Sequence, residues 1–470
     1  MPPGVSFGTA RAGATIVFAV GVAAVVALAI AARPAKRMVD FDQSFYLTVA
    51  YDLDRHGVFS NGVFDSTDST AAPPPPGMFF APLYPVLIFA AVQVDPRFAR
   101  AVACTVEADH KKRDLDTCEI YPRPMHVIHV LFLTLGILAI ALAGEAIFAS
   151  RRVFYLGGIL ATAAVAMEAD LFSYIMTGSV WLSLYSLTLC AFVFALKTWR
   201  ARWFIAAGGL LGVLCLTRPS FLLLAPVLLC LVAAYARWIA IEAWTRNATA
   251  FAVAFAIVIA PWLARNQVSV GKLRFTEEYG SATLVERFAF NAMTAREFFL
   301  AFPYCVPAIG PPIVERLAGA DAMRRFEWNE PGSFFEIGRA RRMELVSAHG
   351  RLDPIILELV GDEMRRNGLS HLATTMPLAW CGLWVAGVWS LALLPLFVCA
   401  CVAAGRRRNA LFLAYALPPL ILVGVHAALA NHYPRYNLGL IGPFAVGAAA
   451  VIAGPLRAAR PQSRSSAPAA

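Results

Sequence analysis

The chain has 470 residues, of which 59% are hydrophobic and only 15% are charged. Soluble domains contain roughly 25% charged and 45–50% apolar residues, so a soluble globular protein is excluded and a multi-pass membrane protein is predicted. The net charge of +10 does not indicate a nucleic-acid partner, because the basic residues lie in short clusters between apolar runs.

The first apolar run, residues 12–32, is followed at once by two carboxylates. The run is long enough to span a bilayer and too long for a signal-peptide core, so a retained first helix is predicted. Asp40 and Asp42 then lie at an interface, and helical spacing begins at Asp42. The residues on one face of this helix are Asp42, Tyr46, Val49 and Leu53. The alternative is that Asp42 only caps the helix and complements its dipole.

The next stretch combines proline-rich and cysteine-bearing segments. Pro73–Pro76 predicts a short polyproline segment. Residues 79–92 are apolar but short and interrupted by proline, which indicates a re-entrant or interfacial segment. Cys104 and Cys118 bracket a charged loop and are predicted to pair if that loop faces an oxidising compartment. The cysteines in apolar spans are interpreted as small core residues, and they are Cys190, Cys215, Cys230, Cys381, Cys399 and Cys401.

About ten transmembrane helices are predicted in an all-α fold. After residues 12–32, the expected spans are 125–148, 153–172, 174–196, 202–217, 219–236, 247–264, 376–403, 409–429 and 436–455. The chain is expected to turn at Arg218-Pro219, because the residue before a proline is disfavoured in helical geometry.

Basic residues give the orientation. They gather in alternate short loops, which the positive-inside rule places in the cytoplasm. These loops carry Arg151-Arg152, Lys197 with Arg200 and Arg202, Arg237 with Arg246, Arg406–Arg408, and Arg457 with Arg460. Arg33, Lys36 and Arg37 oppose this orientation, but five loops outweigh one.

On this topology the conspicuous polar residues lie on the outer side. A charge near hydrocarbon is costly unless it is paired or lines a wet cavity, so the gathering indicates function. Each residue also has a structural explanation: Arg265 and Arg435 as snorkelling side chains, Glu168 and Asp170 as helix ends, and His432 as an interface histidine. The candidate site residues are Asp40, Asp42, Tyr46, Glu168, Asp170, Arg218, Arg265, His432 and Arg435.

Arginines beside a carboxylate suit a phosphate-bearing amphiphile. A guanidinium binds phosphate oxygens through a forked pair of donors and stays charged. An aspartate can remove a proton from a hydroxyl or amine as it attacks. A lipid-phosphate-linked sugar satisfies both requirements.

Short motifs in a fixed order carry a family resemblance over residues 12–455. In this order the sequence resembles the GT-C membrane glycosyltransferases, in particular the dolichyl-phosphate-mannose protein mannosyltransferases and the bacterial aminoarabinose or mannosyl transferases. The motifs are Asp42 with Tyr46, Ala50 and Leu53, then Pro82–Pro85, Leu216-Thr217-Arg218-Pro219, Pro261-Trp262 with Arg265-Asn266, and Arg435-Tyr436.

The resemblance implies an inverting transfer from a polyprenyl-phosphate sugar to a glycan, lipid or protein acceptor. It implies Asp42 as the general base, with Arg218 and Arg435, and then Arg265, at the donor phosphate. The chain departs from the family where Gln43 follows Asp42, since most relatives have an acidic pair there. Asp40 and Asp42 face the same side only on an extended backbone. Which of the two is the base stays open, as does a divalent cation; no other cofactor is expected.

The domain organisation follows from these spans. Residues 1–264 are predicted to form a transmembrane module with a catalytic first outer loop at 33–78, and 376–456 the C-terminal helices. Residues 265–375 are expected to be an extracytoplasmic region that selects the acceptor or only covers the helices, with an amphipathic helix at 353–371 on the membrane. The tail 457–470 reads as disordered and basic.

Two other classes remain open on the sequence. One is a transporter or flippase for a lipid or small anion, although neither internal repeats nor charged residues near mid-bilayer are evident. The other is a polymerase or ligase of lipid-linked glycans, which needs no aspartate after the first helix. The predicted location is the inner (plasma) membrane, with membrane lipids as surroundings and the active site on the extracytoplasmic face.

Overall fold

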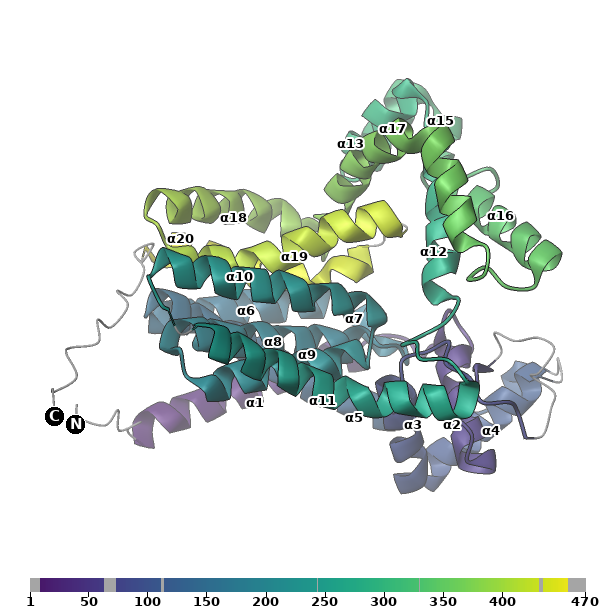
Figure 1. The fold of residues 1–470 in the computed structure, drawn as a ribbon, viewed down its shortest axis with the longest axis horizontal. Helices are drawn as coiled ribbons and strands as arrows, with labels where there is room; N and C mark the ends of the chain where they lie inside the picture. The colour runs from purple at the N-terminus through teal and green to yellow at the C-terminus, as the bar shows by residue number, and fades with distance from the viewer. Residues whose placement is uncertain are drawn as a thin grey trace, which may run out of the picture.

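The computed structural model describes residues 9–62, 73–110, 114–242, 244–328, 330–430 and 434–454. Within these ranges every regular element is an α-helix or a short 3-10 helix, and there is no strand. The helices that run side by side as a bundle (Figure 1) are α1 (Thr9–Ala31), α5 (Arg123–Phe148), α6 (Arg151–Met167), α8 (Gly178–Thr198), α9 (Ala201–Cys215), α10 (Leu224–Trp238), α11 (Trp244–Val270), α18 (Val388–Arg406), α19 (Ala410–Leu429) and α20 (Ile441–Ala453).

The bundle confirms an all-α, multi-pass membrane protein. Among the described residues, eight helices are long and apolar enough to cross a bilayer. Two of the expected spans are shorter in the structure. The span expected at 153–172 is α6, with 17 residues, and the span expected at 202–217 is α9, with 15 residues. The expected boundary at residue 264 falls inside α11, which continues to Val270.

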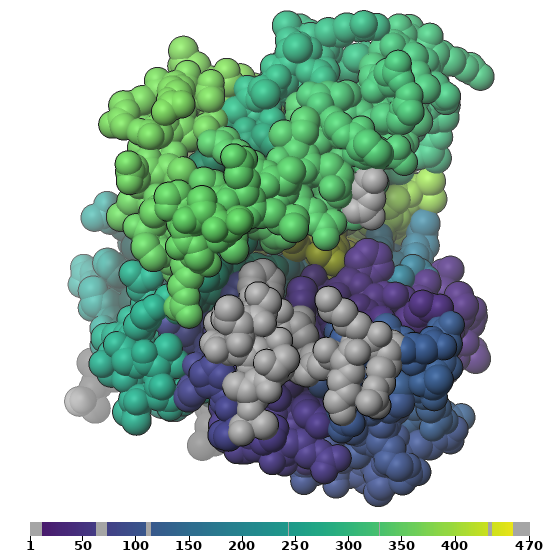
Figure 2. Space-filling view, turned by 90° about the vertical axis from the view of Figure 1, so that its right-hand side faces the viewer, coloured from purple at the N-terminus to yellow at the C-terminus, as the bar shows by residue number. Residues whose placement is uncertain are grey.

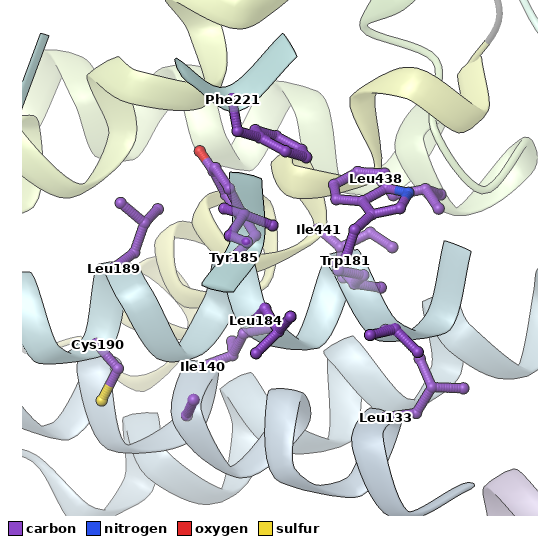
Figure 3. Packing of buried hydrophobic residues seen from close by; sticks show 14 of the residues in the cluster. Leu133, Ile140, Trp181, Leu184, Tyr185, Leu189, Cys190, Phe221, Leu438 and Ile441 are labelled. Atoms are coloured by element: carbon purple, nitrogen blue, oxygen red, sulfur yellow. The ribbon is translucent and has the colours of Figure 1, made fainter. Parts of the chain in front are cut away.

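Close packing of small and aromatic residues holds the bundle together. Helix α5 packs against α1, α6 and α8, and α9 packs between α8 and α11. A Cβ on Gly208 of α9 would lie 2.1 Å from the Phe251 carbonyl oxygen of α11, so the two backbones can only meet at a glycine. At the centre, Trp181 and Tyr185 of α8 pack with Phe221 and Leu438 (Figure 3).

The two ends of the bundle differ. Helix α1 begins and α20 ends at one end, where the basic turns between α5 and α6, α8 and α9, and α18 and α19 also lie (Figure 1). Two lobes occupy the opposite end, which we call the lobe end. Viewed toward that end, the late-loop lobe in green lies above the first-loop lobe in purple and blue (Figure 2).

The first-loop lobe consists of the described residues between 33 and 122. Its elements are α2 (Gln43–His56), α3 (Leu83–Val94), α4 (Pro96–His110) and the 3-10 helix η2 (Leu115–Thr117). The predicted pair Cys104–Cys118 is a disulfide, which confirms that expectation. The proline-rich residues 82–85 open α3, a short apolar helix, as its length indicated.

The late-loop lobe consists of the described residues between 271 and 367. It contains α12 (Tyr279–Phe288), η4 (Ala289–Ala292), α13 (Ala295–Tyr304), α14 (Gly310–Ala318), α15 (Ala320–Arg324), α16 (Phe334–His349) and the first part of α17 (Ile356–Gly382). Helix α17 is interrupted at Asn367, where φ is −129°. Its second part returns to the bundle.

Two expectations about this region are wrong. The span predicted at 376–403 is divided, because α17 ends at Gly382 and α18 begins at Val388. The left-handed residues Ala386 and Gly387 make the turn between them. Cys381 is not a solitary core residue but forms a disulfide with Cys305 of the late-loop lobe. The apolar run around Cys381 correctly predicts that its side chain is buried. It does not indicate the disulfide partner, which lies 76 residues away in the sequence.

Candidate functional site

Asp42 occupies the N-cap position of α2 but does not act as a cap. Its side chain makes no capping hydrogen bond. Instead the carboxylate lies 3.6 Å from a guanidinium nitrogen of Arg435, across the lobe end of the bundle. Both side chains are partly open to solvent, with 37% of Asp42 and 27% of Arg435 exposed. The structure therefore does not support the alternative that the Asp42 side chain only caps α2.

A buried glutamine fixes the backbone around this aspartate. Gln43 is 1% exposed, and its amide donates to the carbonyl oxygens of Arg37 at 2.8 Å and Asp40 at 2.9 Å. Its own oxygen accepts from the Ile175 backbone N–H at 2.7 Å. Gln43 thus ties the start of α2 to the connection before α8, and an acidic residue there could not donate to the two carbonyls.

Asp40 does not share the position of Asp42. The intervening Phe41 has φ 55°, and its ring packs against Tyr174 with centroids 5.1 Å apart. Asp42 itself has φ −78° and ψ 2°, so the segment is a turn rather than an extended strand. The extended backbone required to align the two carboxylates is absent from this turn.

Arg218 joins the site from the break between α9 and α10. It is extended, with φ −146° and ψ 116°, and Pro219 begins the 3-10 helix η3 (Pro219–Leu223), which confirms the predicted turn. Its guanidinium lies over two aromatic rings, 4.7 Å from the centroid of Tyr436 and 5.6 Å from that of Trp181. Among described residues no carboxylate lies within 4.0 Å of Arg218.

Tyrosines complete the cluster. Tyr46 lies near the Thr177 side chain and within electrostatic range of Asp42, Arg218 and Arg435. Burial raises the pKa of Tyr46, Asp42 raises it further, and Arg218 opposes the change. The phenol therefore stays protonated at neutral pH and is a hydrogen-bond donor.

Tyr279 brings the late-loop lobe to the same place. Burial raises its pKa, with Tyr436 as the next contribution, and Arg218 opposes the shift. Its ring lies 5.7 Å from that of Phe79, and the adjacent Glu277 N–H donates to the Met78 carbonyl at 3.2 Å. Both lobes thus meet the bundle at the Asp42–Arg435 pair.

Arg265 is close to the first-loop lobe but is bound in another way. Its guanidinium donates to the carbonyl oxygens of Phe59, at 2.8 Å, and Gly77, and it also reaches the Asn266 side chain at 3.1 Å. The side chain lies over the rings of Phe59 and Trp262. These contacts tie the two ends of the first loop to α11.

The remaining candidates lie elsewhere. Asp170 pairs with Lys36 at 2.8 Å. Glu168 ends α6 and lines a separate cavity with late-loop residues. His432 lies outside the described residues. The structure therefore brings together Asp42, Tyr46, Arg218 and Arg435, and it leaves Asp170 and Glu168 apart from them.

Metal-ligating side chains are not gathered around Asp42. In the searched, described part of the chain, the one group of three is Glu277, Glu278 and Asp353. Its carboxylates are already engaged: Glu277 with Lys272 and Arg351, Glu278 with the backbone N–H groups of Leu352 and Asp353, and Asp353 with Arg274 and Ser281.

Sequence patterns do not predict a role at the site for three residues, which are Gln43, Thr177 and Tyr279. Gln43 stands out only because it occupies a position where an acidic residue is expected. Thr177 and Tyr279 carry no motif, and their places follow from packing of distant segments. The charge of Arg218 and Arg435 was visible because each lies at the end of an apolar run.

The fold and the cluster define a multi-pass helical membrane protein with a charged, aromatic site at one end. Neither a protein-family model nor a curated protein sequence matches this chain. Among solved structures it is similar to ArnT from Cupriavidus metallidurans bound to undecaprenyl phosphate, at 14% identity and TM-score 0.43, covering 93% of this chain and 78% of that one. It is also similar to the Archaeoglobus fulgidus oligosaccharyltransferase in its apo form, at 14% identity and TM-score 0.45, covering 93% of this chain and 50% of that one.

Proposed function

We propose that the protein is an integral-membrane glycosyltransferase. It transfers a sugar from a polyprenyl-phosphate donor to a glycan, lipid or protein acceptor at the extracytoplasmic face of the inner membrane. The transfer inverts the anomeric centre, and Asp42 is the general base. The observation that carries the proposal is the meeting of the non-capping Asp42 with Arg435, beside Arg218.

In this proposal the two arginines hold the donor phosphate. Guanidiniums form forked, charge-assisted hydrogen bonds to phosphate oxygens. Arg218 rests on aromatic rings, which leaves the edges of its guanidinium as the donating groups. The protonated phenols of Tyr46 and Tyr279 add neutral donors at the same place. The result is a set of donors converging on an anion.

The chemical step then follows from the position of Asp42. The carboxylate accepts the proton of the acceptor hydroxyl or amine as that atom attacks the anomeric carbon from the face opposite the phosphate. The bond between the anomeric carbon and the phosphate oxygen breaks, and its electron pair leaves with the phosphate. Arg218 and Arg435 stabilise the charge that develops on that oxygen, where fixed donors contribute most to catalysis.

Donor binding also changes the resting ion pair. A phosphate competes with Asp42 for Arg435, because both anions bind the same guanidinium. Asp42 is then released from the pair as the donor arrives, and its lone pairs become available to the acceptor. The phosphate thereby couples donor binding to the activation of the base.

The test uses purified protein in lipid nanodiscs with a panel of polyprenyl-phosphate sugars and measures release of polyprenyl phosphate. Asp42→Asn is expected to lower turnover by about 10²–10⁴-fold, the usual contribution of a general base, with donor binding retained. Asp109→Asn, a substitution at a half-buried position of α4 outside the cluster, is the matched control and is expected to keep parental turnover.

Asp40→Asn separates the two acidic residues. Parental turnover in Asp40→Asn, with loss in Asp42→Asn, supports a single base at Asp42. Equal loss in both variants would contradict that assignment. If the intact protein neither binds nor turns over any such donor, the transferase proposal fails and transport of a lipid or anion becomes the better explanation.

A further inference from the structure

A cavity lies between the late-loop lobe and the bundle. Its volume is about 410 Å³, within the range of roughly 300–1,000 Å³ for small-molecule sites. One wall is formed by Glu168 at the corner of α6 and α7 (Ala169–Ser173), and another by Trp384 and Gly387 between α17 and α18. The late-loop lobe closes it from α13 to the start of α16. None of its lining residues belongs to the Asp42 cluster.

The charge of this cavity is negative throughout. Its described lining residues include two carboxylates, Glu168 and Glu327, and no lysine, arginine or histidine. Neither carboxylate has a cationic side chain within 4.0 Å in the described part of the chain. Burial raises the pKa of Glu168, and the nearby backbone N–H of Ala386 opposes the shift. In a protein with a net charge of +10, two half-buried acids without a cation beside them are conspicuous.

Aromatic faces make up most of the remaining wall. Trp328 and Phe335 stack with their ring centroids 3.5 Å apart. Tyr304 faces Glu327: burial, with the neighbouring carboxylate, raises the pKa of Tyr304 to about 12. Cations are attracted to the faces of such rings by their quadrupoles.

One polar atom in the wall has no partner. Trp384 is 8% exposed, and its indole N–H makes no hydrogen bond to any described residue. Its nitrogen is covered by neighbouring atoms, so it belongs to the packed wall and offers the cavity no donor.

The walls are built rigidly. The Cys305–Cys381 disulfide forms part of the lining and joins the lobe to α17. Ala386, which precedes the lining residue Gly387, is left-handed with φ 56°. Non-glycine residues rarely adopt this conformation, and such residues gather at ligand sites.

We propose that this cavity binds an organic ammonium ion of about the size of choline, holding the cation between Glu168, Glu327 and the aromatic faces. The two carboxylates supply the charge, and the rings supply the apolar faces. The inference stands on the cavity alone and does not depend on transferase activity.

The first experiment compares two ligands of the same shape on the intact protein. Choline and its neutral isostere 3,3-dimethyl-1-butanol are titrated by calorimetry into nanodiscs whose lipids carry no amine. Choline is expected to bind at least about tenfold more tightly, as a partly desolvated cation on aromatic faces predicts. Equal affinity for the two ligands, or no saturable binding of choline, would overturn the proposal.

Variants locate the site. Glu168→Gln and Glu327→Gln are each expected to weaken choline binding about tenfold, because each variant removes a negative charge that attracts the cation. Glu330→Gln, a half-buried neighbour outside the lining, is expected to bind choline like the parent protein. If both lining variants bind like the parent, the cavity is not the site. If Glu168→Gln fails to fold, Glu327→Gln and the comparison of the two ligands still test whether the cavity binds the cation.

The amine can come from solution or from a lipid headgroup. Nanodiscs with matched anionic lipid content and either phosphatidylethanolamine or a neutral glycolipid distinguish the two sources. Weaker choline binding with phosphatidylethanolamine identifies a headgroup that occupies the cavity, and unchanged binding identifies a soluble amine. Choline binding without sugar transfer supports this inference while the transferase proposal fails. Sugar transfer without choline binding supports the transferase proposal and contradicts the inference about the cavity.

Discussion

Arg287 and Arg218 are both half or fully buried arginines near the lobe end, yet their surroundings differ in kind. Arg287, on α12, is 0% exposed, and its donors reach the Ala427 carbonyl at 2.7 Å, Asn291 at 3.0 Å and the His371 carbonyl at 3.1 Å. Arg218 lies against aromatic rings, and no carboxylate among described residues lies within 4.0 Å. The first arginine joins a lobe to the bundle, whereas we propose that the second presents its donors to the donor phosphate.

The comparison separates structural from functional charge. Burial lowers the pKa of Arg287 to about 10, with Glu363 opposing the shift, so this arginine is still cationic at neutral pH. Its donors are distributed over backbone and side-chain oxygens on η4, α17 and α19. Arg265 belongs to the same group, since it donates to the carbonyls of Phe59 and Gly77. The sequence shows that each arginine is charged. Only the contacts in the folded structure show whether its donors are engaged by oxygens of the protein.

The largest effect on stability is expected at Arg287. Arg287→Ala leaves the Ala427 carbonyl without its side-chain donor and removes one of the donors to the His371 carbonyl and the Asn291 side chain. An unsatisfied buried group costs roughly 1–3 kcal/mol. The free energy of unfolding is expected to fall by about 4 kcal/mol in total. Thermal and denaturant unfolding in detergent measure the change.

Arg339→Ala is the matched control. Arg339 forms an exposed i,i+3 pair with Glu336 at 3.6 Å on α16, and loss of such a pair changes stability by less than about 1 kcal/mol. A small effect of Arg287→Ala, comparable to that of the control, would contradict the structural assignment.

Arg218 should behave in the opposite way. Arg218→Ala is expected to lower sugar transfer by about 10²-fold, the typical effect of removing one charge-stabilising donor. Its two ring contacts are worth about 0.5–1 kcal/mol each, so the unfolding midpoint changes little. Steady-state transfer and unfolding are measured on the same preparation. A variant that transfers normally, or one that unfolds like Arg287→Ala, would remove the distinction between the two arginines.

Gln43 tests whether the site needs an acidic pair. Gln43→Glu replaces the amide that donates to the carbonyls of Arg37 and Asp40 by a carboxylate that cannot donate. Stability is expected to fall by about 2 kcal/mol, and transfer should not rise. Unfolding and transfer assays measure both. Faster transfer, or activation by a divalent cation, would show that the position works as part of an acidic pair.

The smallest effect is a pH dependence within the late-loop lobe. Glu297 accepts from the Thr294 backbone and side chain and pairs with Arg325 at 2.8 Å. Although burial opposes it, these contacts leave the pKa of Glu297 below its ordinary value. Its contribution, about 1 kcal/mol for a capping interaction, is therefore complete above the ordinary pKa near 4.5 and is lost as pH falls through the lower folded value. The slope of stability against pH below 4.5 is expected to flatten in Glu297→Gln, and an unchanged slope would contradict this.

Much of the bundle could be predicted from the sequence, because the apolar length that a bilayer requires is a local property. The turn at Arg218-Pro219 was equally local, since proline restricts the residue before it. The division of residues 376–403 could not be predicted from local sequence, because the left-handed turn at Ala386 and Gly387 lies inside a continuous apolar run. Composition alone predicts one span there.

The candidate site was predicted in part for the same reason. Asp42, Arg218 and Arg435 stand out as charges at the ends of apolar runs, and the structure brings them together with Tyr46. Arg265 stands out equally, but its carbonyl partners come from residues about 190–200 positions away. The pairing of Cys305 with Cys381 and the approach of Tyr279 likewise depend on how distant segments pack.

In the proposed mechanism, Asp42 and the donor phosphate compete for Arg435. The most direct test is the affinity of the Asp42→Asn variant for polyprenyl phosphate, measured by calorimetry in nanodiscs beside the parent protein and Asp109→Asn. Removing the carboxylate leaves Arg435 without its competitor, so the variant should bind polyprenyl phosphate at least as tightly as the parent while sugar transfer is lost. Weaker binding by Asp42→Asn, with Asp109→Asn unchanged, would contradict the account, because Asp42 would then hold the donor rather than receive a proton.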